Sequence, residues 1–143
     1  MAARPEHSPA EPELIEQGEC WEHWQCGRTR WWIIRFRDGS YGRNRDRLER
    51  QLRRGCEPIV FVISRLKDLD SISLSGFLLC AESSSRTGRL IGLVGRQAAV
   101  KLKLVLKMMS ISPPNLREFP CIEAAETAII RQGRASSANR GRE

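Results

Sequence analysis

The amino-acid sequence predicts an α/β fold built on a mixed, mainly parallel sheet, and three observations support this. The apolar runs at residues 58–64 and 89–94 lack polar alternation, as strands covered on both faces do. Helical spacing of apolar residues follows each of these runs. Strand and helix therefore alternate, which requires parallel strands joined by right-handed crossovers. The length of 143 residues suits one domain with a single core.

The first half of the chain predicts a hairpin, a helix and a central strand. Two aromatic, strand-like runs at residues 20–25 and 30–36 indicate an opening hairpin. Residues 44–54 have one apolar face and stop at Gly55, which is typical of a helix end. The hairpin also carries four tryptophans, which either pack against the sheet or form an exposed patch for a partner: Trp21, Trp24, Trp31 and Trp32.

The second half predicts three helices and two further strands. The first of these helices begins near Ser71 to Ser73, runs to about residue 86 and is followed by Gly88. The consecutive prolines at 113 and 114 prevent a later helix from continuing. The remaining elements, in order, are a strand at 89–94, a helix at 98–109, an edge strand at 116–119 and a helix at 122–131.

The composition of the two ends predicts disordered segments around a domain at residues 19–132. Residues 1–18 are rich in Pro and Glu with little to bury, and residues 133–143 are polar and basic. No apolar run approaches the roughly 18 residues needed to cross a bilayer. The start of the chain is too acidic and too rich in proline for a signal peptide. We therefore expect a cytoplasmic protein without membrane insertion.

The net charge of +7 raises the question of an acidic partner or nucleic acid. Much of the excess lies in residues 28–54, where it is interleaved with acidic residues. The pairs Asp46 with Arg50 and Glu49 with Arg53 have the i, i+4 spacing of ion pairs on a solvated helix face. No arrangement of arginines and aromatic residues matches a known nucleic-acid module, so a basic nucleic-acid-binding function ranks behind protein binding.

The cysteine and histidine content argues against a disulfide framework, a metal site or an enzyme. Five scattered cysteines are an odd number, and Cys80 and Cys121 have the apolar neighbours of reduced core thiols. Cys20, His23 and Cys26 lack a fourth ligand and the usual zinc spacing, and we expect His23 to be an exposed strand residue. No obvious general base lies near the serines described next. We expect no cofactor.

The sequence LDSISLSGFLL at residues 69–79 is the strongest candidate for a functional site. It leads from a buried strand into an amphipathic helix through Asp70 and Ser71. Either side chain can cap the free amides of the first helical turn, and the positive end of the helix dipole favours an anion there. Capping alone would explain Asp70 and Ser71. A resemblance in the rest of the chain suggests a function in addition to capping.

Four segments, in order, resemble the STAS domain of anti-sigma factor antagonists. In that family a buried strand ends on Asp-Ser before an apolar helix, as residues 70–75 (DSISLS) do here. The other three segments are TGRLIGLV at 87–94, VKLKLVLKMMSI at 100–111 and REFPCIEAAETAI at 117–129. The resemblance spans about residues 30–131. It implies a four- to five-stranded sheet with helices packed on one side.

The resemblance also implies a switch at Ser71. In the family, the hydroxyl after the Asp is phosphorylated by a partner that is both an anti-sigma factor and a serine kinase. The unphosphorylated protein binds that kinase, and a serine phosphatase resets the modified form. Ser73 and Ser75 are alternative acceptors, because they stand where the family has glycines, with a glycine displaced to Gly76. The implied partner-binding residues are Asp70, Ser71, Ser73, Leu74 and Ser75, with Arg65 and Lys67 moderating the charge.

Two other functions stay open at this point. A STAS-type accessory subunit of a transporter ATPase or sensory assembly would use the same surface without a phosphate. A nucleic-acid-binding module would show affinity that falls steeply with salt. The first strand and turn, IIRFRDGSYGR, lack the family's Gly-x-Leu-Asp pattern, which leaves that part of the surface without a counterpart.

Overall fold

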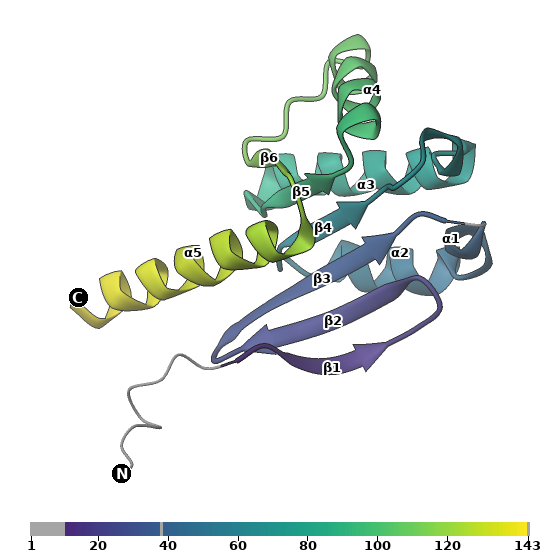
Figure 1. The fold of residues 1–143 in the computed structure, drawn as a ribbon. Helices are drawn as coiled ribbons and strands as arrows, with labels where there is room; N and C mark the ends of the chain where they lie inside the picture. The colour runs from purple at the N-terminus through teal and green to yellow at the C-terminus, as the bar shows by residue number, and fades with distance from the viewer. Residues whose placement is uncertain (1–10, 38, 143) are drawn as a thin grey trace.

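The computed structural model describes residues 11–37 and 39–142, with side chains described as far as residue 135. Within them, six strands form one sheet with spatial order β1-β2-β3-β4-β5-β6 (Figure 1). The strands are β1 (Glu13–Gln17), β2 (Trp21–Cys26), β3 (Thr29–Arg35), β4 (Ile59–Val62), β5 (Ile91–Val94) and β6 (Leu116–Phe119). The helices are α1 (Ser40–Arg43), α2 (Arg45–Arg54), α3 (Ser71–Thr87), α4 (Arg96–Met108) and α5 (Ile122–Arg142), with a 3₁₀ turn at Leu66–Asp68.

The sheet is mixed, as the sequence predicts. β1, β2 and β3 pair antiparallel, whereas β3 to β6 pair parallel in sequential order. Each parallel step contains a helical crossover, because parallel neighbours cannot be joined by a tight turn. The α/β class is confirmed. The sheet has one strand more than the upper limit of the expected range.

Parts of the two segments expected to be disordered have regular structure, whereas residues 1–10 of the expected leader lie outside the described residues. Residues 13–17, assigned to the leader, form β1 and pair with β2. All five are exposed, so no buried face marked them as a strand. Residues 133–142, assigned to the tail, continue α5. Helix propagation costs little once a turn exists, which lets a polar segment extend an anchored helix.

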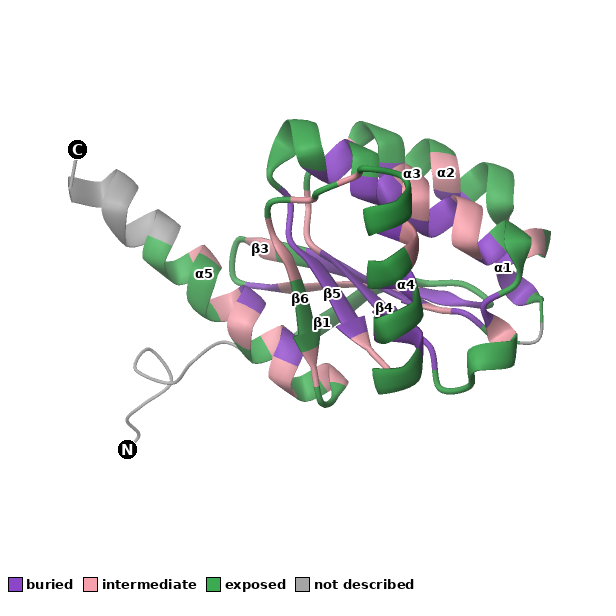
Figure 2. Cartoon of the chain, turned by 90° about the horizontal axis from the view of Figure 1, so that it is seen from above, coloured by how far each residue is buried: buried purple, intermediate pink, exposed green. Residues whose placement is uncertain are grey.

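Helices cover both faces of the sheet, which corrects the expectation of helices on one side (Figure 2). One face packs against α2, α3 and α4, through side chains such as Leu48, Phe77 and Leu102. The other face, with Trp31 and Val60, packs against Ala125 and Ile129 of α5. Right-handed crossovers that advance in one direction place their helices on the same face. The helix α5 follows the last strand and is not a crossover, so the handedness rule does not apply to it.

The hairpin tryptophans pack into the structure, as one of the two interpretations predicted. Trp21, Trp31 and Trp32 are buried. His23 is also largely covered, contrary to expectation, since it stacks on Trp32 at 4.0 Å between ring centroids. Glu57 Oε1 lies 2.9 Å from His23 Nε2 and accepts a hydrogen bond from Trp32 Nε1 at the same distance.

The cysteines are free thiols. Cys20 lies in the core beneath α2 and α3, and Cys26 lies in the core beneath α5, so the two occupy opposite faces of the sheet and cannot share one metal ion. Cys121 is exposed, which corrects its assignment to the core, whereas Cys80 is buried as predicted.

Candidate functional site

The candidate site lies where the chain leaves β4 and enters α3. The 3₁₀ turn at Leu66–Asp68 carries the chain to Leu69, which is buried and anchors the loop. Asp70 is the N-cap of α3, and its Oδ1 accepts a hydrogen bond from the backbone N–H of Ser73 at 2.8 Å. The predicted helix start and capping role are therefore confirmed.

The three serines of this segment differ in exposure. Ser71 is the first residue of α3 and is exposed, Ser73 is buried and Ser75 is half-buried. Of the three side chains, only that of Ser71 is fully accessible to another molecule, and that of Ser73 is closed off. The three serines therefore differ in accessibility, which the sequence alone could not show.

The charged side chains near Ser71 differ in the contacts that they make. The Arg65 guanidinium contacts the Asp68 carboxylate, with Nε 3.1 Å from Oδ2. Lys67 and Asp70 are exposed. Arg65 is thus already engaged with a carboxylate inside the loop, whereas Lys67 extends the basic surface.

Exposed apolar side chains flank Ser71. Leu66 and Ile72 are each 40% exposed, on either side of Asp70 along the chain. Leu74, also assigned to the partner surface, is only half-exposed and packs against the core. Gly76 faces inward, because a Cβ there would lie 2.1 Å from Tyr41 Oη. This glycine therefore serves the packing of α1 on α3 and offers no backbone to a partner.

The helix α4 adds an apolar stripe that sequence reasoning missed. Leu102 and Leu106 are buried, whereas Met109, at the end of the same helix, is 53% exposed. The outer stripe has helical spacing and lies among lysines, and it consists of Val100, Leu104 and Met108. The signal was present, since VKLKLVLKMM has apolar residues on more than one face.

A hollow of about 430 Å³ opens at the carboxyl ends of β4, β5 and β6. Its lining includes Ser64, Arg96 and Phe119. Gly95 approaches so closely that a Cβ there would lie 2.2 Å from the Ile63 carbonyl oxygen, at a φ of +131°. The lining does not include residues 65–71, so this hollow and the Ser71 loop are separate surfaces that meet at Ser64 along the chain.

Among the described residues, no group of three or more His, Cys, Asp or Glu side chains is arranged to hold a metal ion. In the same part of the chain, no helix is long and apolar enough to cross a membrane. No protein-family model, curated protein or solved structure matches this chain. The site must therefore be interpreted from its own chemistry.

Proposed function

We propose that this protein is a phosphorylation-switched binding domain that acts as an anti-sigma factor antagonist in the cytoplasm. Its unphosphorylated form would bind an anti-sigma factor that is also a serine kinase, and phosphate on Ser71 would end that binding. The observation that carries the proposal is the exposed Ser71 hydroxyl, held at the first position of α3 by the Asp70 cap.

The physical basis of the switch is local. A phosphate adds a charge of about −1.5 to −2. The free amides and positive dipole of a helix N-terminus tolerate an anion, so the domain stays folded after modification. A partner surface with negative charge opposite Ser71 would be repelled, and binding would be lost without refolding.

The surrounding surface favours a partner with apolar and acidic groups. Leu66 and Ile72 supply apolar area beside the acceptor, and Lys67 supplies positive charge. Opposite charges at the rim of an interface increase the association rate more than the final affinity. A serine phosphatase would restore the binding form.

The test is affinity purification of the tagged protein from its native host, with mass spectrometry of the peptide at residues 68–86. We expect an ATP-binding kinase to co-purify with the unmodified protein, and phosphate to map to Ser71. Ser71→Asp should lose the kinase, and Ser71→Ala should retain it and carry no phosphate at residue 71. Ser85→Asp is the matched control, because Ser85 is an exposed serine in the last turns of the same helix.

The proposal fails if the peptide is unmodified in every fraction and Ser71→Asp retains every partner of the unmodified protein. Capture of a transporter ATPase under those conditions would favour the accessory-subunit function instead. Thermal unfolding of Ser71→Asp should match that of the wild type, because a variant that unfolds would lose partners for a trivial reason.

A further inference from the structure

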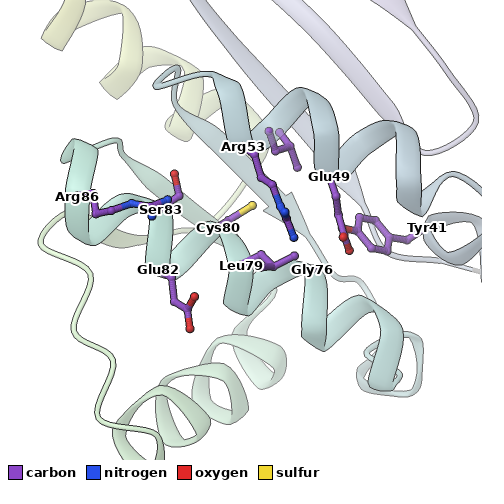
Figure 3. A pocket seen from close by; sticks show the side chains of 10 residues that line it. Tyr41, Glu49, Arg53, Gly76, Leu79, Cys80, Glu82, Ser83 and Arg86 are labelled. Atoms are coloured by element: carbon purple, nitrogen blue, oxygen red, sulfur yellow. The ribbon is translucent and has the colours of Figure 1, made fainter.

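A pocket of about 360 Å³ lies between α2 and α3, on the side of α3 that faces α2 (Figure 3). Its inner part is built from buried groups, among them the Tyr41 ring, Leu52, Gly76 and Cys80. Charged residues of both helices surround the rest. The full lining is Tyr41, Glu49, Leu52, Arg53, Gly76, Leu79, Cys80, Glu82, Ser83 and Arg86.

Two hydroxyls in this lining are buried without a hydrogen-bond partner. Tyr41 is 1% exposed and Ser83 is 4% exposed, and neither Tyr41 Oη nor Ser83 Oγ bonds to any described residue. A buried polar group without a partner costs about 1–3 kcal/mol, and such groups are rare in native structures. Both hydroxyls therefore need a hydrogen-bond partner that the described residues do not supply.

Two arginines and two glutamates line the pocket, and Glu49 is the one of the four with an ion pair among the described residues. Glu49, which the spacing predicted to pair with Arg53, pairs with Arg45 instead, with 3.1 Å between Nε and Oε2. No hydrogen bond or ion pair joins Arg53 or Arg86 to any described residue. In Figure 3 the Arg53 side chain reaches from α2 toward α3, whereas the Glu82 carboxylate points away from Cys80.

The inner groups are neutral. Burial raises the pKa of the Tyr41 hydroxyl, with a smaller contribution from the charge of Glu49 among other groups, so this hydroxyl remains a proton donor. Burial also raises the pKa of the Cys80 thiol to about 12, so it adds no negative charge. The pocket thus offers hydroxyl donors and an apolar floor inside, with unpaired guanidinium groups at its mouth.

We infer that this pocket binds a small organic carboxylate with an apolar body. The carboxylate would bind Arg53 and Arg86 and accept a hydrogen bond from Ser83. The Tyr41 hydroxyl lies against Gly76, seven residues and about 10 Å before Ser83 along α3, so it is beyond the reach of the same carboxylate. The apolar body would contact Leu52, Leu79 and Cys80. This inference is separate from the proposed switch, because it concerns a different surface of α3 and its test needs no protein partner.

The test is a titration of the isotopically labelled full chain with three probes of one shape: benzoate, benzamide and benzamidine, which carry negative, zero and positive charge. Amide shifts are followed by NMR at low chloride concentration. We expect saturable shifts at Gly76, Cys80 and Ser83 with benzoate, and shifts at least several-fold weaker with the other two. No saturable shift, or an equal response to all three probes, would overturn the inference and leave ordered water as the occupant.

Substitutions of single lining residues test whether benzoate binds in this pocket. Arg53→Gln should weaken benzoate binding about tenfold, which is the loss expected for one charge-assisted hydrogen bond. Arg54→Gln is the matched control, since Arg54 is exposed on the same turn of α2 and does not line the pocket. Ser83→Ala should weaken benzoate binding while the rest of the spectrum stays that of the folded protein, and Tyr41→Phe should weaken it less, because Tyr41 lies about 10 Å from Ser83 along α3. Equal affinity of Arg53→Gln and Arg54→Gln for benzoate would contradict the assignment.

Discussion

Gly76 shows how one missing methyl group fixes the packing of two helices. A Cβ at this position would lie 2.1 Å from Tyr41 Oη and 2.4 Å from Cζ of the same ring. Tyr41 is itself buried and packed against Phe36, with 5.2 Å between the ring centroids, which restricts its movement. The contact between α1 and α3 therefore depends on a glycine that helix propensity alone would disfavour.

We predict that Gly76→Ala destabilises the protein. Alanine would gain about 1 kcal/mol from helix propensity, but overpacking against a rigid ring costs about 1–3 kcal/mol. Gly42→Ala is the control, because a Cβ there would meet Ile72 at an ordinary 3.6 Å. Urea denaturation measures both. A Gly76→Ala variant at least as stable as Gly42→Ala would contradict the packing argument.

Arg89 is a buried cation that ties together three segments of the chain. Its Nη1 donates to the Leu52 carbonyl at 2.8 Å, near the end of α2, and its Nε donates to the Glu57 carbonyl at 2.9 Å, just before β4. Its own position directly precedes β5. Burial lowers the pKa of the guanidinium, which nevertheless stays charged because arginine starts so high.

We predict that Arg89→Met lowers the free energy of unfolding by at least about 2 kcal/mol, because two buried carbonyls lose charge-assisted hydrogen bonds. The stability of Arg89→Lys should fall between that of the wild type and that of Arg89→Met. One lysine ammonium cannot reproduce both hydrogen bonds of the guanidinium. Arg54→Met, at an exposed position, should change stability by no more than about 0.5 kcal/mol. Chemical denaturation of the three variants tests this, and equal stability of Arg89→Met and Arg54→Met would refute it.

At the scale of elements, α5 docks on the sheet partly through a carboxyl that is half-buried. Glu126 of α5 accepts a hydrogen bond from Trp31 Nε1 of β3 at 3.1 Å. Burial raises the pKa of this carboxyl, and the Trp31 hydrogen bond offsets part of that effect. A raised pKa in the folded state means that this group favours folding when protonated. That contribution is lost as pH rises through the folded-state pKa.

We predict that Glu126→Gln is more stable than the wild type at pH 7, because the amide keeps an acceptor for Trp31 without a half-buried charge. The difference should shrink as pH falls and the wild-type carboxyl becomes protonated. Denaturation midpoints of the two proteins at several pH values between 4 and 7 test this. A difference that grows toward low pH would show that the sign is wrong.

Periodicity was enough to predict β4, α3, β5 and α4, because each buries a clear apolar face or stripe. The same reasoning missed β1, whose five residues are all exposed and held by backbone pairing, which carries no hydrophobic pattern. At the site, the Asp70 cap followed from local chemistry. The burial of Ser73 and the choice of Arg45 over Arg53 by Glu49 depend on tertiary packing, and i, i+4 spacing cannot resolve them.

At the scale of the whole molecule, the free energy of local opening should decrease across the sheet, from the buried strand β4 to the edge strand β1. Every residue of β4 is buried, with helices on both faces, whereas β1 is an exposed edge. Backbone hydrogen bonds that open by local fraying exchange faster than those that need global unfolding.

We therefore predict that amide protons of β4 exchange at the rate of global unfolding, and that those of β1 exchange at least about a hundredfold faster. Hydrogen exchange followed by NMR provides the measurement. Protection of β1 comparable to that of β4 would mean that the edge strand is integrated into the core, against the exposure of all its residues.

The position of α5 in the chain has a consequence for biosynthesis. All six strands precede α5, so the sheet leaves the ribosome before the helix that covers its second face. Until then Trp31, Ile33 and Val60 form an uncovered apolar surface on a nascent chain. Such surfaces are where chaperones bind and where stalled or truncated chains associate with one another. The interval between synthesis of β6 and completion of α5 is thus the period in which this protein is most vulnerable to aggregation.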